Sequence, residues 1–246
     1  MTAITSTIQS RKESPSSEWS GLYKLGALTS LLILGTALLE ILITFLPGGY
    51  ASAETVVDWF NLLHDNWFLG LRNLGLLNIV MIALGIPMFF ALCMAHWKIN
   101  PKYAVLALII SVIGDAVFYA TNRAFAMLDL SAQYAAASTE AQRITLEAAG
   151  QALLAVGQSH VPGTFIGFCL GEIAGILISV VMLKGGIFSK LNAWVGILGF
   201  GMLWIYEICQ SFIPGLASFA LIFAMIGGIL NLVWYRLIAQ RFFKLA

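Results

Sequence analysis

The chain has 246 residues, of which 60% are hydrophobic and only 10% are charged, and its formal net charge is +1. Soluble domains carry about 25% charged residues, so this composition excludes a soluble globular protein and indicates a multi-pass protein of the lipid bilayer. The low net charge and the lack of a basic tract also exclude nucleic acid as a partner, because phosphate binding needs clustered Lys and Arg.

The chain begins with a polar segment for which no regular structure is predicted. Residues 1–20 are rich in Ser and Thr and show no apolar period, so we expect a disordered cytoplasmic tail. The apolar run of residues 21–47 exceeds the roughly 20 residues that a helix needs to cross a bilayer. Ala51-Ser52-Ala53 resembles a signal-peptidase site, but the length of this run and Glu40 within it favour a membrane span over a cleaved signal peptide.

Hydropathy and turn residues predict five further membrane spans, so that residues 21–246 form one all-α transmembrane domain with six spans. The five cover about residues 68–96, 103–127, 162–182, 191–212 and 216–238. Pro87 predicts a kink in the second span. The third span forms part of one long predicted helix that runs from Ile110 to Leu130.

Two segments between the spans are too polar to cross a membrane and predict amphipathic helices. Residues 54–67 place acidic and amide side chains on one helical face and apolar side chains on the other, which is typical of a helix at the membrane interface. Residues 130–159 are rich in Ala, and Thr139 and Gln142 have the spacing of a capping box. This second segment is either a lid over a binding site or a capping loop.

The basic residues predict the orientation in the membrane. Of the 13 Lys and Arg residues, all but Arg72, Arg123 and Arg143 fall on one side of a six-span chain. Short loops rich in Lys and Arg stay in the cytoplasm, so both termini are expected to be cytoplasmic and both amphipathic segments extracytoplasmic, at the cell membrane. The aromatic belt expected at the cytoplasmic interface consists of Trp97, Tyr103, Trp234 and Tyr235.

Polar and charged side chains interrupt the apolar spans. A helix returns to the same face every three to four residues, so the third span carries a polar stripe. This stripe consists of Ser111, Asp115, Tyr119 and Asn122, with Arg123 one turn beyond Tyr119. Apart from Lys24 and Arg236 near the cytoplasmic ends, the charged residues inside the predicted spans are Glu40, Arg72, Asp115, Arg123, Glu172 and Glu207.

These six charges are expected to meet in one polar chamber. A rise of about 1.5 Å per residue places Asp115 and Glu172 near the midplane and the other four in the outer half. Each charge costs about 2.5–3.5 kcal/mol to insert, so the charges should face one another or a water-filled cavity. Two arginines cannot neutralise four carboxylates, and the surplus must be protonated, hydrated or matched by a bound cation.

The leading functional hypothesis is the binding or transport of a small solute, cation or proton. The alternatives are an intramembrane enzyme that uses the carboxylates as acid and base, an accessory subunit that binds another protein through the small residues at 167, 171, 175 and 179, and ion pairs that only fix the bundle. No cofactor or metal site is expected, because the histidines lack metal-ligand spacing and the three cysteines lie in apolar stretches. The candidate binding residues are Glu40, Arg72, Asp115, Tyr119, Asn122, Arg123, Glu172 and Glu207.

Two stretches of the sequence resemble a family of bacterial multi-pass membrane proteins that is defined as a domain of unknown function. They are residues 114–157, which begin GDAVFYATNRAF, and residues 171–190, which begin GEIAGILISVVM. The resemblance implies a bacterial cell-membrane location. It assigns no activity, so it gives no residue a role, and the oligomeric state also stays open.

Overall fold

The computed structural model describes residues 19–46, 53–157 and 160–246, which are helical and contain no strand. Six of the helices are long and apolar enough to cross a membrane. These are α1 (Ser20–Phe45), α4 (Leu76–Ala95), α5 (Pro101–Thr121), α8 (Phe165–Gly185), α9 (Lys190–Phe212) and α10 (Ala217–Leu245). The structure therefore confirms an all-α, multi-pass membrane protein. Residues 1–18 of the expected tail, and Ala51 and Ser52 of the expected cleavage motif, lie outside the described residues.

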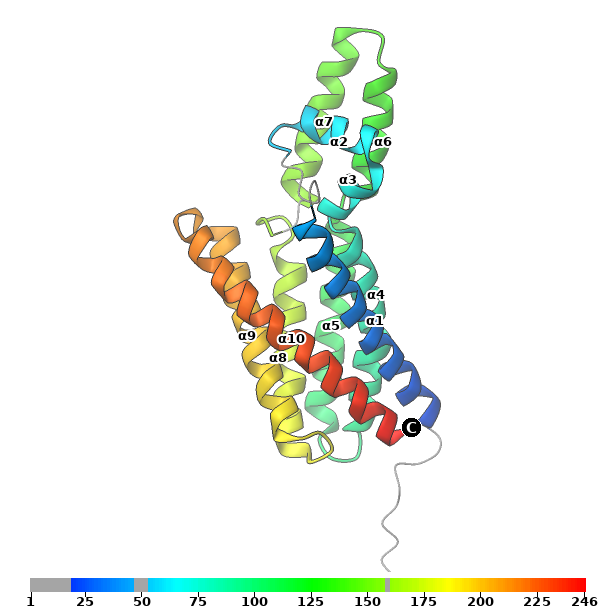
Figure 1. The fold of residues 1–246 in the computed structure, drawn as a ribbon, viewed down its shortest axis with the longest axis vertical. Coiled ribbons are helices and arrows are strands. Elements are labelled where there is room, and N and C mark those ends of the chain that lie inside the picture. The colour runs from blue at the N-terminus through cyan, green and yellow to red at the C-terminus, as the bar shows by residue number, and fades with distance from the viewer. Residues whose placement is uncertain (1–18, 47–52, 158–159) are drawn as a thin grey trace, which may run out of the picture.

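The six long helices form a closed ring. Each contacts the next along the chain, in the order α1, α4, α5, α8, α9 and α10, and α10 packs against α1 to close the ring. The Ser20 hydroxyl donates a hydrogen bond to the main-chain oxygen of Ala246 at 2.5 Å, so the start of α1 and the end of α10 are neighbours (Figure 1). We call this end of the bundle the terminal end and the opposite end the cap end.

An apolar core fills the half of the ring nearest the terminal end. Trp234 and Phe242 of α10 are fully buried there and pack with Ile178 and Met182 of α8. The expected position of Trp234 in an aromatic belt is therefore wrong, because its ring lies inside the bundle. Trp97 and Tyr103, by contrast, are about half exposed at the terminal end.

The small residues of α8 pack inside the chain. A Cβ atom added at Gly167 would touch Phe118 of α5, and one at Gly175 would overlap the ring of Phe200 of α9. Ser179 is fully buried against Gly196 of α9. This face is therefore occupied by neighbouring helices, and the accessory-subunit hypothesis loses the surface that it required.

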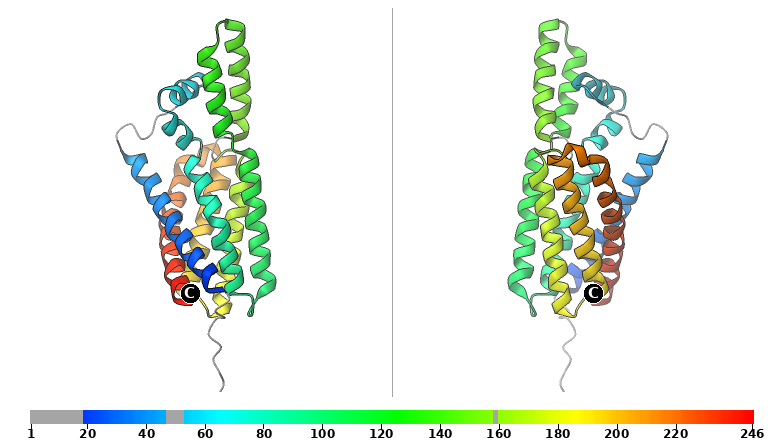
Figure 2. Two further views of the ribbon diagram at one scale, coloured as in Figure 1. Left: turned by 90° about the vertical axis from the view of Figure 1, so that its right-hand side faces the viewer. Right: turned by 90° about the vertical axis from the view of Figure 1, so that its left-hand side faces the viewer.

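Four shorter helices lie beyond the end of the ring that is opposite the chain termini, and we call them the cap (Figures 1 and 2). They are α2 (Val56–Asp65), α3 (Trp67–Asn73), α6 (Ala124–Ala136) and α7 (Glu140–Gly157). Phe60 and Leu63 of α2 are buried against α6 and α7, so the apolar face of α2 packs on protein. The sequence had predicted that this face lies on a membrane surface. The hairpin of α6 and α7 runs away from the bundle, and its predicted capping box between Thr139 and Gln142 is confirmed.

Two helices that the sequence predicted as continuous are broken where the bundle meets the cap. Gly75 has a φ of 92° and separates α3 from α4, and Asn122 is extended and separates α5 from α6. The Asn122 amide donates to the carbonyl of Leu74 at 3.0 Å and accepts from the backbone N–H of Ala124 at 3.1 Å. One side chain thus satisfies backbone groups at both breaks, which compensates for the helical hydrogen bonds that the breaks remove.

Charge is segregated along the long axis of the molecule. Every Asp and Glu in the described residues lies in the cap or in the cap-end half of the ring. The described Lys and Arg residues lie in the terminal half, with the exceptions of Arg72, Arg123 and Arg143. The negative groups inside the membrane are therefore confined to one half of the bundle.

The first turn of α2 depends on a carboxylate. The Asp58 carboxylate accepts hydrogen bonds from the Thr55 backbone N–H at 2.8 Å and from the Thr55 hydroxyl at 2.7 Å, and these bonds hold the pKa of Asp58 below its usual value. A group with a depressed pKa stabilises the fold above its unfolded pKa, and the stabilisation is lost as the pH falls through the folded pKa. We expect hydrogen-exchange protection factors in this turn, corrected for intrinsic exchange, to fall on acidification.

The variant Asp58→Ala isolates this effect. Its protection factors should be low at neutral pH and should not change as the pH is lowered, because the titrating carboxylate is gone. An equal acid-induced loss of protection in Asp58→Ala and in the unmodified chain would contradict the assignment to Asp58.

Candidate functional site

A cavity of about 310 Å³ lies within the cap-end half of the ring, beyond the apolar core. All six long helices contribute to its wall, from Ile33 of α1 to Tyr235 of α10. Gly171 of α8 opens onto this space, since no heavy atom lies within 4 Å of a Cβ added there. Ligand sites typically have volumes of about 300–1,000 Å³, so the cavity suits a small molecule.

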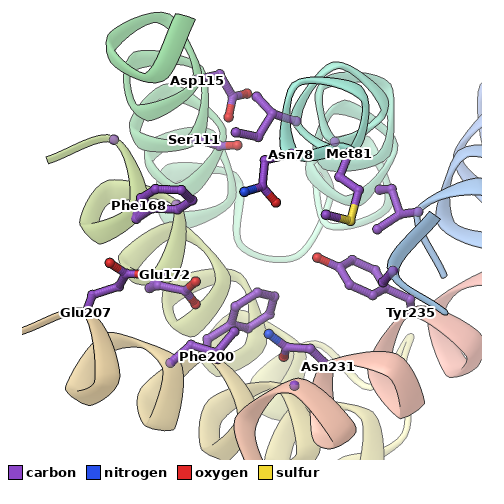
Figure 3. Close-up of a pocket in the computed structure, with 18 of the residues that line it drawn as sticks. Asn78, Met81, Ser111, Asp115, Phe168, Glu172, Phe200, Glu207, Asn231 and Tyr235 are labelled. Atoms are coloured by element: carbon purple, nitrogen blue, oxygen red, sulfur yellow. The ribbon is translucent and has the colours of Figure 1, made fainter. Parts of the chain in front are cut away.

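Three carboxylates on three neighbouring helices line this cavity. They are Asp115 of α5, Glu172 of α8 and Glu207 of α9 (Figure 3). Ser111 lies one turn before Asp115 and also lines the cavity. These two members of the predicted polar stripe therefore face the cavity. The Glu207 side chain is only 3% exposed. The structure thus brings together three of the four acids that the sequence singled out.

The only basic side chain that faces these acids from the described residues is a histidine. His160 Nδ1 lies 2.6 Å from Glu207 Oε1, and the imidazole stacks on Phe168 with ring centroids 4.8 Å apart. The histidine precedes α8 and has a φ of 59°, a conformation that costs a non-glycine residue about 1 kcal/mol or more. The hydrogen bond to Glu207 and the ring contact with Phe168 hold it there, and His160 lines the cavity on the side of the cap.

Unpaired hydrogen-bond acceptors characterise the interior of the cavity. Asn231 of α10 is 6% exposed, and Asn78 of α4 and the Tyr235 hydroxyl point into the same space (Figure 3). Four buried oxygen atoms that line it have no hydrogen-bond partner among the described residues. They are Asp115 Oδ2, Glu172 Oε2, Glu207 Oε2 and Asn231 Oδ1. A buried acceptor without a donor is costly, so the cavity favours an occupant that donates hydrogen bonds.

Apolar side chains complete the wall between these polar groups. Phe168, Phe200 and Met81 lie around the carboxylates and amides in Figure 3. Such a lining excludes bulk water from part of the space and strengthens the electrostatic interactions within it. The site therefore combines separated negative groups with an apolar surface.

Glu40 and Arg72 form a separate ion pair outside this cavity. The Arg72 guanidinium lies 2.6 Å from Glu40 Oε1 and also binds the Thr44 hydroxyl and the Glu40 carbonyl. Arg72 belongs to α3, before the break at Gly75, so it lies in the cap and not within a membrane span. The prediction that this pair shares a chamber with Asp115 and Glu172 is therefore wrong.

The end of the predicted polar stripe is also separate from the cavity. The Tyr119 hydroxyl donates to the carbonyl of Ile79 at 3.2 Å, and Asn122 bridges the two helix breaks. The aliphatic part of Arg123 packs on Gly157 at the end of α7, where a Cβ atom would overlap it. Tyr119 thus links α5 to α4 within the ring, whereas Asn122 and Arg123 lie where the bundle meets the cap. Arg72 and Arg123 lie outside α4 and α5.

The described residues contain no group of three His, Cys, Asp or Glu side chains placed to hold a metal ion. His64 is exposed on α2, and His96 is buried near the terminal end, stacked on Phe188. The three cysteines form no disulfide, and Cys169 accepts a hydrogen bond from the Trp204 indole at 3.1 Å.

No protein-family model matches the chain, and it has no match among curated proteins or solved structures. No activity can therefore be transferred from a relative, and the functional inference depends on the residues around the cavity.

Proposed function

We propose that this membrane protein binds a small cationic solute in the cavity and transports it across the bilayer. The observation that carries the proposal is the charge of the cavity wall, which has three carboxylates and no Lys or Arg among the described residues. Burying carboxylates without a counter-charge is costly, so a bound cation offsets a penalty that the empty site bears.

Exchange with protons is part of this proposal. A carboxylate in an apolar setting is neutralised either by a proton or by a cation, so the binding of one favours the release of the other. Such competition couples movement of the cation to a proton gradient. The filled half of the ring, between the cavity and the terminal end, must open for the solute to pass.

We further propose that the terminal end faces the cytoplasm of a bacterial cell and that the cap lies outside. The support for this orientation is the concentration of Lys and Arg toward the terminal end, since short basic loops are retained in the cytoplasm. The bacterial location rests on the resemblance carried by residues 114–157 and 171–190.

Proteoliposomes that enclose a pH-sensitive dye test the carrier proposal. Na⁺, K⁺, Mg²⁺, 1-aminobutane and 1,4-diaminobutane are added in turn, and at least one is expected to drive proton movement. Asp115→Asn and Glu172→Gln should each slow that response by about tenfold or more, as expected for loss of a charged hydrogen bond worth about 1.5–3 kcal/mol. Asp129→Asn is the control, because Asp129 is exposed on α6.

A response to none of the five cations would overturn the proposal. So would an unchanged response in both cavity variants, since the carboxylates would then have no part in it.

An intramembrane enzyme is the second candidate function. Glu172 and Glu207 lie on the neighbouring helices α8 and α9 and line the same cavity, as a general acid and base acting on one molecule must. This function predicts chemical conversion of a solute by the purified protein, which mass spectrometry of the medium detects. Proton movement without any conversion favours the carrier.

A further inference from the structure

Two carboxylates of the cavity have no basic partner among the described residues. Glu207 is paired with His160 at 2.6 Å, whereas the described residues form no ion pair with Asp115 or Glu172. If the solute alone neutralises the charges of Asp115 and Glu172, it must carry two positive charges. A monovalent solute leaves one of them without a partner.

The two carboxylates enter the cavity from separate positions. In Figure 3 the Asp115 side chain points in from α5 and the Glu172 side chain from α8, with the ring of Phe168 lying between them in this view. Their approach from different helices and different directions favours two separate charged groups over one metal ion. An elongated solute with a charge at each end reaches both.

The unpaired oxygen atoms of the cavity indicate which kind of cationic group the solute carries. The four unpaired oxygen atoms of the cavity are all acceptors, and two of them belong to side chains that are more than nine-tenths buried, Glu207 and Asn231. A primary ammonium group presents three N–H donors. A quaternary ammonium group presents none and leaves these acceptors unsatisfied. The oxygen atoms thus favour primary amines.

From these observations we propose that the solute is a short aliphatic diamine. One ammonium group binds Asp115, the other binds Glu172, and the methylene chain between them packs on Phe168 and Met81. The Asn231 side chain accepts a further N–H donor near Glu172. This inference deepens the carrier proposal and rests on it, since it names the class of cation that the same cavity takes.

Isothermal titration calorimetry of the full chain in lipid nanodiscs compares 1,4-diaminobutane with 1-aminobutane, which has the same carbon chain and one charge fewer. The diamine is expected to bind about tenfold or more tightly, because it forms a second charge-assisted hydrogen bond. Asp115→Asn and Glu172→Gln should each weaken diamine binding about tenfold, leave 1-aminobutane binding within about threefold, and so remove the preference. Asp129→Asn should keep it.

A variant that retains the charge tests the spacing independently of any loss of folding. Asp115→Glu lengthens the side chain by one methylene group and brings the carboxylate nearer to Glu172. The preferred diamine should therefore shift from 1,4-diaminobutane toward 1,3-diaminopropane, and a titration series of both compounds measures this shift. An unchanged preference in Asp115→Glu would overturn the assignment of Asp115.

The failure of this inference is distinguishable from failure of the carrier proposal. Equal affinity for 1-aminobutane and 1,4-diaminobutane would overturn the diamine and leave a carrier of single cations. Tighter binding of Na⁺ or Mg²⁺ than of either amine would do the same. An absence of binding by any of these cations would overturn both.

Discussion

Replacing Arg72 with methionine is expected to lower the free energy of unfolding by about 1.5–3 kcal/mol, the usual worth of a hydrogen bond to a charged group, since the Glu40 side chain that remains is 34% exposed. The Arg72 side chain is 4% exposed, and its guanidinium holds Glu40 and Thr44 of α1 and Asn73 at the end of α3. Without it, the Glu40 carboxylate loses its counter-charge, and α3 loses its link to α1. Denaturant unfolding in mixed micelles, followed by circular dichroism, measures the change.

Two further variants show whether the pair is the cause. In Arg72→Met combined with Glu40→Met, no unpaired charge remains, so the double variant should recover part of the lost stability. Arg143→Met removes an exposed arginine of α7 and should change stability by less than about 0.5 kcal/mol. If Arg72→Met costs no more than Arg143→Met, the pair does not fix the cap to the bundle.

A single methyl group at Gly196 is expected to destabilise the bundle by about 1–3 kcal/mol, the usual cost of overpacking. The added Cβ would overlap the Ser179 hydroxyl and the indole of Trp234, both of which are fully buried. Since the buried Ser179 hydroxyl and the Trp234 ring must both shift, α8, α9 and α10 cannot keep their present separation. Unfolding of Gly196→Ala in the same micelles measures the loss.

The matched control lies on the same helix. Gly201 has no heavy atom within 4 Å of an added Cβ, so Gly201→Ala gains only helix propensity and should stabilise the chain by about 0.5–1 kcal/mol. The two identical substitutions therefore carry opposite signs. The same sign at both positions would contradict the close packing inferred at Gly196.

Hydropathy was sufficient to predict the six membrane-length helices, because a bilayer requires long apolar runs and each run is a local property. Helical periodicity was also sufficient to place Ser111 and Asp115 on one face, and both line the cavity. It failed at Asn122, seven residues after Asp115, since α5 ends at Thr121 and the chain turns. The signals for the breaks were polar residues and glycine, Asn122 at one and Gly75 at the other.

Counting residues gives the depth of a side chain but not the direction in which it points. Glu40 and Glu207 were placed in one layer, and yet Glu40 turns to α3 whereas Glu207 turns to the cavity. Tyr235 was expected at the membrane interface, but its hydroxyl lies in the cavity because the ring closes there. These outcomes depend on which helices become neighbours, and the sequence offered no repeat or motif that fixed their order.

The closed ring has a consequence for biosynthesis. Helices enter the membrane in chain order, so Asp115, Glu172 and Glu207 arrive before α10, which carries Asn231 and meets α1 last. Until α10 is in place, the ring is incomplete and the cavity lacks one of its walls. Substitutions that weaken the packing of α10 should therefore expose the newly made protein to membrane proteases. We expect such substitutions to lower the amount of protein in the membrane.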